Sequence, residues 1–514
     1  MSIIRKFMAV LLAGAWLIVP VITQGQTSHT DSSKPRVIIT CDPELDDLNS
    51  MIRFLLFSTD YQVEGLIYAS SQFHWKGDGK GTKFYVPNRE YSRNGIDYGP
   101  MESYRWDPNE RFIDDAVEAY EKVYPNLRVH DPSYPTPEYL KSKIRVGNVE
   151  FDGDFSKDTP GSELIKAVML DDCMDPVFIN AWGGCSTIAR ALKSIQDIYE
   201  HIETWTAIRE KIIRKVVLCL SGDQDDTYAK YIRPFWPELR QMEISSYSVG
   251  LAYLAQTRTA EENKIFYSPE WMQENIRSKG PFGEMYRVWG DGKQMCKGDK
   301  FDYFGIAGYT DEELRQQGYM VWAPVQPQGS YLAEGDTYCF LNVIGNGLRG
   351  HEDPTYGGWC GGRLDLPDSV KALPRMEQMK YTAEHFPLPD FTAAVMNGLA
   401  ARFKWSVTPD YKDANHEPVI EGDLAMTGKP GETLKLKYKV TDPDKDAVTV
   451  NWWQYVSAGS YEGRVSVDDP TQAVTTFTIP QDAKSGDTIH LILEATDNGA
   501  PSLNHYLRLI ITVV

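Results

Sequence analysis

Two patterns of apolar residues alternate between residues 35 and 412. Short, largely apolar runs predict buried strands, among them RVIIT, VEGLIYASS, PVFINAWGG and KVVLCLSGD. Segments with helical spacing, such as LNSMIRFLLFS and CSTIARALKSI, follow such runs. Apolar strands that are each followed by a helix are typical of a parallel sheet covered on both faces. We therefore expect an α/β domain over residues 35–412.

The pattern changes near residue 416. In TLKLKYKV, one face carries Leu434, Leu436, Tyr438 and Val440, and the other carries lysines. VTVNWWQY, TTFTI, IHLILEATD and YLRLIITVV follow, separated by turn sequences such as TDPDKD and DNGAPS. Strict alternation in short segments predicts an antiparallel β-sandwich of immunoglobulin- or cadherin-like type over residues 416–514.

The role of this second domain has two interpretations, a binding module and a structural cap on the first domain. Trp452 and Trp453 are adjacent, so in a strand their side chains point to opposite faces. One would lie in the core, and the other would be either a sugar platform or part of an interface. Because no flexible Ser/Thr- or Gly-rich tether precedes the domain, we favour core plus interface.

Residues 1–26 have the pattern of a secretory signal peptide. Arg5 and Lys6 precede the apolar run FMAVLLAGAWLIVPVI, and a polar segment follows. The alternative, a membrane anchor, is less favoured because the run is short and no stop-transfer pattern follows it. We therefore expect an exported protein, periplasmic or secreted, with no membrane span in the mature chain.

Two long stretches interrupt the α/β pattern. Residues 76–160 and 265–330 are rich in aromatic, Gly and polar residues and have weak periodicity. Long loops in an enzyme often build the wall of the binding pocket. Decoration of the surface is an equally good interpretation from the sequence alone.

Charge and cysteine content narrow the possible partners. The 514 residues include 53 Lys and Arg against 72 Asp and Glu, a net charge of −19. This charge disfavours nucleic acid and anionic membranes and suits a neutral ligand, a cationic ligand or a bound metal. The seven cysteines are scattered without CxxC spacing, which favours buried free thiols and leaves any disulfide pairing open.

Acidic residues are concentrated where the first strand ends. VIITCDPELDDLNS places Asp42 at the strand exit and Asp46 and Asp47 at the start of the next helix. Either a cation binds there, or the acids are solvated in a turn. Carboxylates that converge in a low-dielectric cleft repel one another strongly, and a hard divalent cation removes that cost. Ca²⁺ takes about six to eight oxygen ligands, so other strand ends must contribute.

IITCDPELDD resembles the N-terminal signature of the nucleoside hydrolases. In that family an Asp, a Pro-containing turn and a paired Asp-Asp hold a catalytic calcium, which implies Asp42, Asp46 and Asp47 here. The family usually has another Asp where this chain has Thr40, and Gly where it has Glu44.

Three later segments extend the resemblance. GLIYASSQ is similar to the segment whose last residue contacts the sugar, which implies Gln72. WGGCSTIARAL is similar to the segment in which a Thr carbonyl binds calcium, which implies Ser186. EGDTYCFL is similar to the segment in which an Asp completes the metal shell, which implies Asp336 and puts Gly335 where a His often stands.

The chain is also similar to a divergent, exported branch of this family, the Sde182-type proteins, some of which are labelled cellulose-binding. IRFLLFSTDYQVEGLIYASS, EGDTYCFLNVIGNGL and GHEDPTYGGWCGGR carry this likeness. It implies a nucleoside hydrolase-like parallel-sheet domain followed by an immunoglobulin-like domain.

The resemblance implies a calcium-dependent hydrolase of glycosyl, and in particular N-glycosyl, bonds. Asp42 would activate a water that the ion holds, and the leaving group would take a proton from His74 or His351. The alternative is that both histidines are structural. The substrate would be a small glycoside or nucleoside, with polysaccharide left open.

Aromatic residues near the strand ends are candidates for substrate binding. We expect Trp75 in SSQFHW to contact substrate, together with Tyr356, Trp359 and Arg363 in GHEDPTYGGWCGGR. The alternative for the second segment is a tight Gly-rich crossing with a buried Trp.

Two other functions were weighed against hydrolysis. The first is a carbohydrate-binding protein on a catalytically degraded hydrolase fold, suggested by Thr40, Glu44 and Gly335. The second, a phosphatase of the haloacid dehalogenase type, requires a nucleophilic Asp where Thr40 stands, so we reject it.

Overall fold

The computed structural model describes residues 34–245, 249–373 and 375–514. The predicted signal peptide, residues 1–26, lies outside the described residues. In the part that is described, no helix is long and apolar enough to cross a membrane.

A parallel sheet organises the first domain, as predicted. Within the described residues it has six strands in the order β3-β2-β1-β4-β5-β6. The strands are β1 (Arg36–Cys41), β2 (Gln62–Tyr68), β3 (Ile144–Val146), β4 (Val177–Ala181), β5 (Val216–Leu220) and β6 (Arg240–Gln241). Every residue of β1 is buried, which explains its continuous apolar run.

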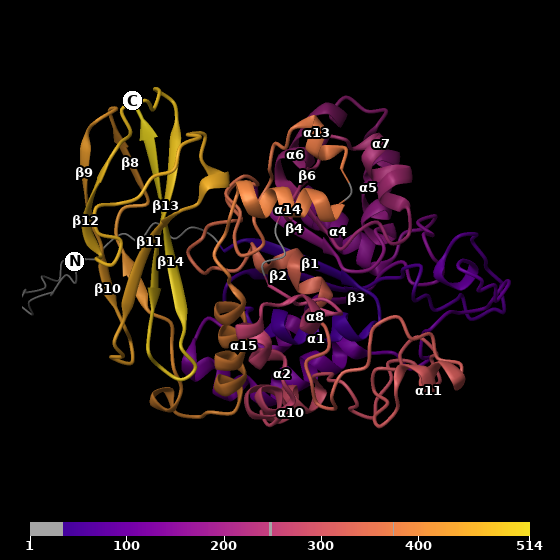
Figure 1. Ribbon diagram of the computed structural model, residues 1–514. Helices are drawn as coiled ribbons and strands as arrows, with labels where there is room; N and C mark the ends of the chain where they lie inside the picture. The colour runs from indigo at the N-terminus through magenta and orange to yellow at the C-terminus, as the bar shows by residue number, and fades with distance from the viewer. Residues whose placement is uncertain (1–33, 246–248, 374) are drawn as a thin grey trace, which may run out of the picture. The chain divides into compact units, whose positions relative to one another are not determined.

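Helices cover both faces of this sheet (Figure 1). Val37 and Ile39 of β1 face one side and pack with α1, α2 and α15, whereas Ile38 faces the other and packs with α4, α5 and α6. The main covering helices are α1 (Leu45–Leu56), α2 (Phe112–His130), α4 (Pro160–Leu170), α5 (Ser186–Tyr199), α6 (Trp205–Lys215) and α15 (Thr392–Ser406).

The remaining helices are short, apart from α14. They are α3 (Pro137–Lys143), α7 (Arg233–Phe235), α8 (Ala255–Arg258), α9 (Pro269–Met272), α10 (Gly280–Met285), α11 (Asp311–Gln316), α12 (Tyr338–Leu341), α13 (Asp368–Lys371) and α14 (Arg375–His385). The sequence did not predict α2, which lies in the stretch with weak periodicity and contains Pro125.

The strand order places the carboxyl end of β1 at a crossing point of the topology. From β1 the chain adds β2 and β3 on one side and later β4, β5 and β6 on the other. In open α/β sheets, such a point opens a crevice beyond the strand ends, and ligands bind there. The acidic segment after β1 lies at this point.

The C-terminal domain is a strand-rich domain with its own core, as predicted, and its strand pairs are antiparallel except for β14 and β8, which pair in parallel. Its sheets have the orders β11-β13-β14-β8, β12-β9 and β10-β7. Leu434 and Leu436 pack with Leu491 and Leu509 between the sheets. The strands are β7 (Val419–Glu421), β8 (Ala425–Gly428), β9 (Thr433–Lys437), β10 (Lys439–Thr441), β11 (Thr449–Gln454), β12 (Val474–Thr478), β13 (Thr488–Thr496) and β14 (Asn504–Val513).

A buried arginine joins the two domains. Arg508 of β14 is fully buried and donates to the carbonyls of Leu348 (2.6 Å) and Gly357 (2.9 Å) in the first domain. Its guanidinium lies over the ring of Tyr455, 4.4 Å from the centroid. No carboxylate pairs with it among the residues the structure describes. Residues 34–514 accordingly form one compact unit.

The two tryptophans of β11 point to opposite faces, as predicted. Trp452 is buried in the sandwich core. Trp453 lies 6.2 Å from the ring of Phe391 in the first domain, and its indole N–H donates to Glu494. This arrangement is the core-plus-interface interpretation, and Trp453 does not form an exposed platform. All seven cysteines are free.

Candidate metal and active site

The acidic segment turns sharply from β1 into α1. Asp42 follows the last residue of β1, and α1 begins at Leu45, so Asp46 and Asp47 lie in its first turn. Negative side chains are stabilised at a helix N-terminus, where backbone N–H groups point outward. Asp42, Asp46 and Asp47 are nevertheless almost completely buried. The solvated-turn interpretation therefore does not fit this segment.

The two carboxylate oxygens of Asp42 have different surroundings. Oδ2 accepts hydrogen bonds from Ser71 Oγ (2.6 Å) and from Nδ1 of His74 (2.8 Å). Oδ1 is buried and has no hydrogen-bond partner among the described residues. A buried acceptor without a partner is costly, so this oxygen is directed at something that the protein itself does not supply.

Glycine at position 183 leaves space for this oxygen. A Cβ on Gly183 would lie 2.3 Å from Asp42 Oδ1, which is closer than real Cβ contacts. Gly183 follows β4, the strand that pairs with β1. The neighbouring strand end thus borders the unpartnered oxygen without blocking it.

Asp336 lies beside the acidic cluster. It is buried in a short 3-10 turn, Gly335–Thr337, and its charge helps to raise the pKa values of Asp46 and Asp47. Its role as a metal ligand stays a prediction. A Cβ on Gly335 would lie 2.4 Å from Asp46 Oδ2. A histidine at position 335 would therefore displace Asp46, which accounts for glycine there.

Burial and mutual repulsion raise the pKa of most of these acids. Burial, followed by the charge of Asp46, raises the pKa of Glu44 to about 8. Burial is also the main cause that holds the pKa values of Asp46, Asp47 and Asp336 well above their usual range, and their neighbouring carboxylates add to it. The cluster therefore needs either protons or a cation to balance its charge.

The donor set suits a hard divalent cation. Oxygen atoms of Glu44, Asp46 and Asp47 lie within 4.8 Å of one another, and a second group joins Asp42, Glu44 and His74. Carboxylate oxygens are ligands that Ca²⁺ takes. One of those present here, Asp42 Oδ1, has no hydrogen-bond partner among the described residues. Glu44, where glycine is usual in the nucleoside hydrolases, thus adds an acid to the cluster.

Tyr253 belongs to this cluster, although no feature of the sequence indicated it. Its hydroxyl lies 3.2 Å from Asp46 Oδ1 and 3.3 Å from Glu44 Oε1. The chain separation exceeds 200 residues in both contacts. Its segment carries no strand or helix pattern, so only the folded chain reveals it.

Two further predicted residues lie at neighbouring strand ends. Gln72 follows Ser71, and its Oε1 is buried without a partner in the described part of the chain. Ser186 begins α5, and its N–H donates to the buried carboxylate of Asp225 (2.9 Å). The proposed roles of the Gln72 side chain and the Ser186 carbonyl remain predictions.

Trp75 is not exposed to a ligand. Its side chain is fully buried, with Phe84, Tyr91 and Phe151 around it. Trp75 and the aromatic residues of the long loop that follows it pack together as a small separate core. The expectation that Trp75 contacts substrate is therefore corrected.

The Gly-rich segment GHEDPTYGGWCGGR lies at the junction with the second domain. Trp359 is buried against Tyr506, Tyr356 packs edge-to-face on His490, and Arg363 is exposed. His351 is half-buried in the same segment. Arg508 lies over the ring of Tyr356, 5.4 Å from its centroid, and Trp359 packs against the same strand, so the segment is the Gly-rich crossing with a buried Trp. The predicted roles of His351 and Arg363 stay predictions.

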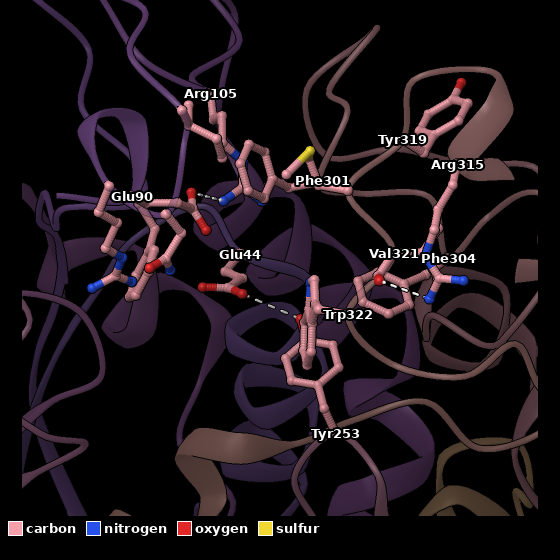
Figure 2. A pocket seen from close by; sticks show the side chains of 15 residues that line it. Glu44, Glu90, Arg105, Tyr253, Phe301, Phe304, Arg315, Tyr319, Val321 and Trp322 are labelled. Atoms are coloured by element: carbon pink, nitrogen blue, oxygen red, sulfur yellow. Dashed lines mark hydrogen bonds and ion pairs between the residues drawn. The ribbon is translucent and has the colours of Figure 1, made fainter. Parts of the chain in front are cut away.

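A cavity of about 620 Å³ opens beside the acidic cluster. Figure 2 shows Glu44 between the Glu90–Arg105 pair and the Tyr253–Trp322 pair. The aromatic recess, as we call it, is the part of this cavity lined by Phe73, Tyr253, Phe301, Phe304, Tyr319 and Trp322. Most of the lining comes from residues 76–160 and 265–330, so these stretches form the pocket wall.

The comparisons with known proteins agree with this architecture. Residues 36–363 match the family described as cellulose-binding Sde182, nucleoside hydrolase-like domain. Residues 433–513 match the C-terminal domain of cellulose-binding protein Sde0182. A nucleoside hydrolase-related hypothetical protein from Saccharophagus degradans, associated with carbohydrate metabolism, has a similar structure. It is 25% identical with a TM-score of 0.65, over 94% of this chain and 100% of that chain. The comparison with curated proteins gave no match.

Proposed function

Since the chain belongs to the cellulose-binding Sde182 family with a nucleoside hydrolase-like domain, we propose that it is an exported, calcium-dependent hydrolase of glycosyl bonds. N-glycosyl compounds are the first substrates to test, with polysaccharide fragments beside them. The observation that carries the proposal is Asp42 Oδ1, a carboxylate oxygen that is buried and has no partner within the described residues, in a group of acids that Glu44 joins to Asp46 and Asp47.

Asp42 is the proposed general base. Ser71 and His74 hold its Oδ2 and so fix the plane of the carboxylate. Oδ1 is left to accept a proton from the attacking water, whose oxygen would bond to the anomeric carbon as the glycosyl bond breaks. The leaving group would depart with the electron pair of that bond and take a proton from solvent. His74 contacts the base directly, which makes it a positioning residue in this proposal.

Asp46, Asp47 and Asp336 would hold the calcium ion, with Asp42 and the Ser186 carbonyl as further ligands. The ion, when bound, supplies positive charge that orients water and sugar hydroxyl groups. Tyr253 orients Asp46 through its hydroxyl. Gln72 would hydrogen-bond the sugar, since its buried Oε1 has no partner among the described residues.

The test combines calcium titration with turnover. Calorimetry on the mature chain should give calcium binding that Asp46→Ala abolishes. Asp42→Asn should reduce hydrolysis of nucleosides and glycosides by about 1,000-fold or more, as expected for loss of a general base that also contacts the ion. Asp172→Asn, at a fully exposed acid, is the matched control and should change neither.

A carbohydrate-binding protein without turnover is the second candidate. The family description and Gly335, which leaves no histidine beside Asp46, favour it. In that case Asp42→Asn would leave sugar binding unchanged, and no substrate in the screen would be hydrolysed by the unmodified protein. Absence of calcium binding would contradict the hydrolase proposal directly.

A further inference from the structure

The cavity that contains the aromatic recess is larger than a single sugar or base requires. Cavities of about 300–1,000 Å³ take ligands of drug size, and this cavity measures about 620 Å³. It begins at Glu44 and Tyr253, which contact the acidic cluster, and extends to Tyr319 and Trp322. A ligand held at Glu44, beside the acidic cluster, thus has room to continue into the recess.

Trp322 presents a large aromatic surface to this space. Its side chain is 49% exposed, and its ring packs edge-to-face on Tyr253 (4.7 Å) and Phe304 (5.5 Å). Because these contacts use only part of the indole, an apolar face is left open. Tyr253 in turn donates a hydrogen bond to Asp46, so only Tyr253 lies between the exposed ring and the acidic cluster.

The segment around Trp322 is held in place. The N–H of Met320 donates to the Lys300 carbonyl (2.9 Å), and Arg315 donates to the carbonyl of Val321 (3.2 Å). The N–H of Ala323 donates to the Tyr303 hydroxyl (2.8 Å), which fixes the chain on the other side of Trp322. An exposed aromatic ring on a fixed segment is a preorganised binding surface.

The opposite wall is also fixed, at a cost in backbone strain. Arg105 has a φ of +47°, in the left-handed region that a non-glycine residue rarely occupies. Glu90 (2.8 Å) and Asp299 (2.7 Å) hold its guanidinium, which lies 5.0 Å from the ring centroid of Phe301. Backbone strain of this kind persists only where surrounding contacts hold the residue in place, and it is common at ligand-binding and active sites.

Two arginines around the cavity are paired with acids. Arg105 is shared between Glu90 and Asp299, and Arg315, on the Trp322 side, lies 3.9 Å from Asp311. Glu44 and Arg93 place further charge in the cavity lining, whereas the six side chains of the recess are aromatic and uncharged. This combination suits a neutral ligand whose rings have apolar C–H faces and hydroxyl rims, which is the chemistry of neutral sugars.

We propose that the aromatic recess binds neutral sugar units beyond the bond at Asp42, and that Trp322 is the residue that selects an oligosaccharide over a nucleoside. The position of the scissile bond rests on the proposed function. The binding of sugar units to the recess does not.

The experiment measures binding of neutral gluco-oligosaccharides of increasing length, and of inosine, to the mature full-length chain. The Asp42→Asn background prevents turnover during titration. Affinity should rise with length until the recess is filled. Trp322→Ala should weaken binding of the longer oligosaccharides about tenfold and leave short ones unchanged, and Trp322→Phe should retain most of the affinity.

Tyr309→Ala is the matched control, because Tyr309 is similarly exposed (45%) and does not line the cavity. It should bind like the parent protein. Equal affinity for all lengths, tighter binding of inosine than of every oligosaccharide, or unchanged binding by Trp322→Ala would overturn the proposal. Length-dependent binding that requires Trp322, in a protein without turnover, would overturn the hydrolase proposal alone.

Discussion

At the scale of single residues, the site depends on positions where a side chain is missing. Gly183 and Gly335 each adjoin a carboxylate oxygen that a Cβ would strike, at 2.3 Å and 2.4 Å. Neither glycine has a positive φ, so their role is to leave space and not to permit an unusual backbone. Gly183 follows β4 and adjoins Asp42, whereas Gly335 opens the 3-10 turn Gly335–Thr337 and adjoins Asp46.

Gly183→Ala should therefore weaken calcium binding without unfolding the protein. The added methyl group would press on Asp42 Oδ1 and tilt the carboxylate away from the ion. Displacing one ligand in this way costs about 10- to 100-fold in metal affinity, which calcium titration measures.

The control for this substitution is Gly398→Ala in α15, where the nearest atom to the new Cβ is 3.7 Å away. It should keep full calcium affinity, because its contact is ordinary and alanine favours a helix. Equal calcium affinity in Gly183→Ala and Gly398→Ala would show that Asp42 Oδ1 is not a ligand.

The convergence of the acids was predictable from sequence, but the partners of these acids were not. Asp42, Asp46 and Asp47 follow a buried strand, and the resemblance added Asp336, which the structure brings to the same place. Tyr253 could not be found in this way, because a single tyrosine in an unpatterned segment carries no signal for a contact across 200 residues.

At the scale of elements, β1, β2, β4, β5, α1 and α5 followed from their periodicity, whereas α2 and the irregular segments did not. The segment GHEDPTYGGWCGGR has the composition of a sugar-binding loop, yet it packs around Arg508. Glycine and aromatic residues serve equally in a flexible loop and in a tight crossing. Composition alone cannot separate the two, because the deciding contact comes from β14, about 150 residues later.

Replacing Arg508 should test the contact between β14 and this segment. Arg508→Ala leaves the carbonyls of Leu348 and Gly357 buried without donors and opens a cavity. We expect a loss of about 3 kcal/mol or more in the free energy of unfolding, measured by denaturant titration.

The control is Lys439→Ala, which removes an exposed ion pair with Glu421. Exposed pairs contribute about 0–1 kcal/mol, so this variant should unfold at nearly the same denaturant concentration as the parent. A similar, small effect of Arg508→Ala would mean that β14 does not support the Gly-rich segment.

At the scale of the whole molecule, the acidic cluster links stability to pH and to calcium. Without calcium, Glu44 has its pKa raised from 4.5 to about 8, so the folded protein keeps a proton that the unfolded chain loses. The stabilisation is full below about pH 4.5 and is lost as the pH rises to about 8. In chelator, the unfolding temperature should therefore fall across this range.

Calcium should reverse that fall, because the ion replaces the protons that the carboxylates lose. The calcium-dependent rise in unfolding temperature should be larger at pH 8 than at pH 5.5, and a single transition should include both domains, since residues 34–514 form one unit. Scanning calorimetry with calcium and with chelator measures both. An equal rise at the two pH values would contradict the coupling.

The distance along the chain between Arg508 and the segment it anchors has a consequence for how the protein is made. That segment begins a dozen residues after Asp336, and its carbonyls receive their donors only when β14 is in place. A ribosome that has synthesised every acid of the cluster must still add more than 150 residues before that anchor exists. The Gly-rich segment therefore takes its final place only after β14 has been made.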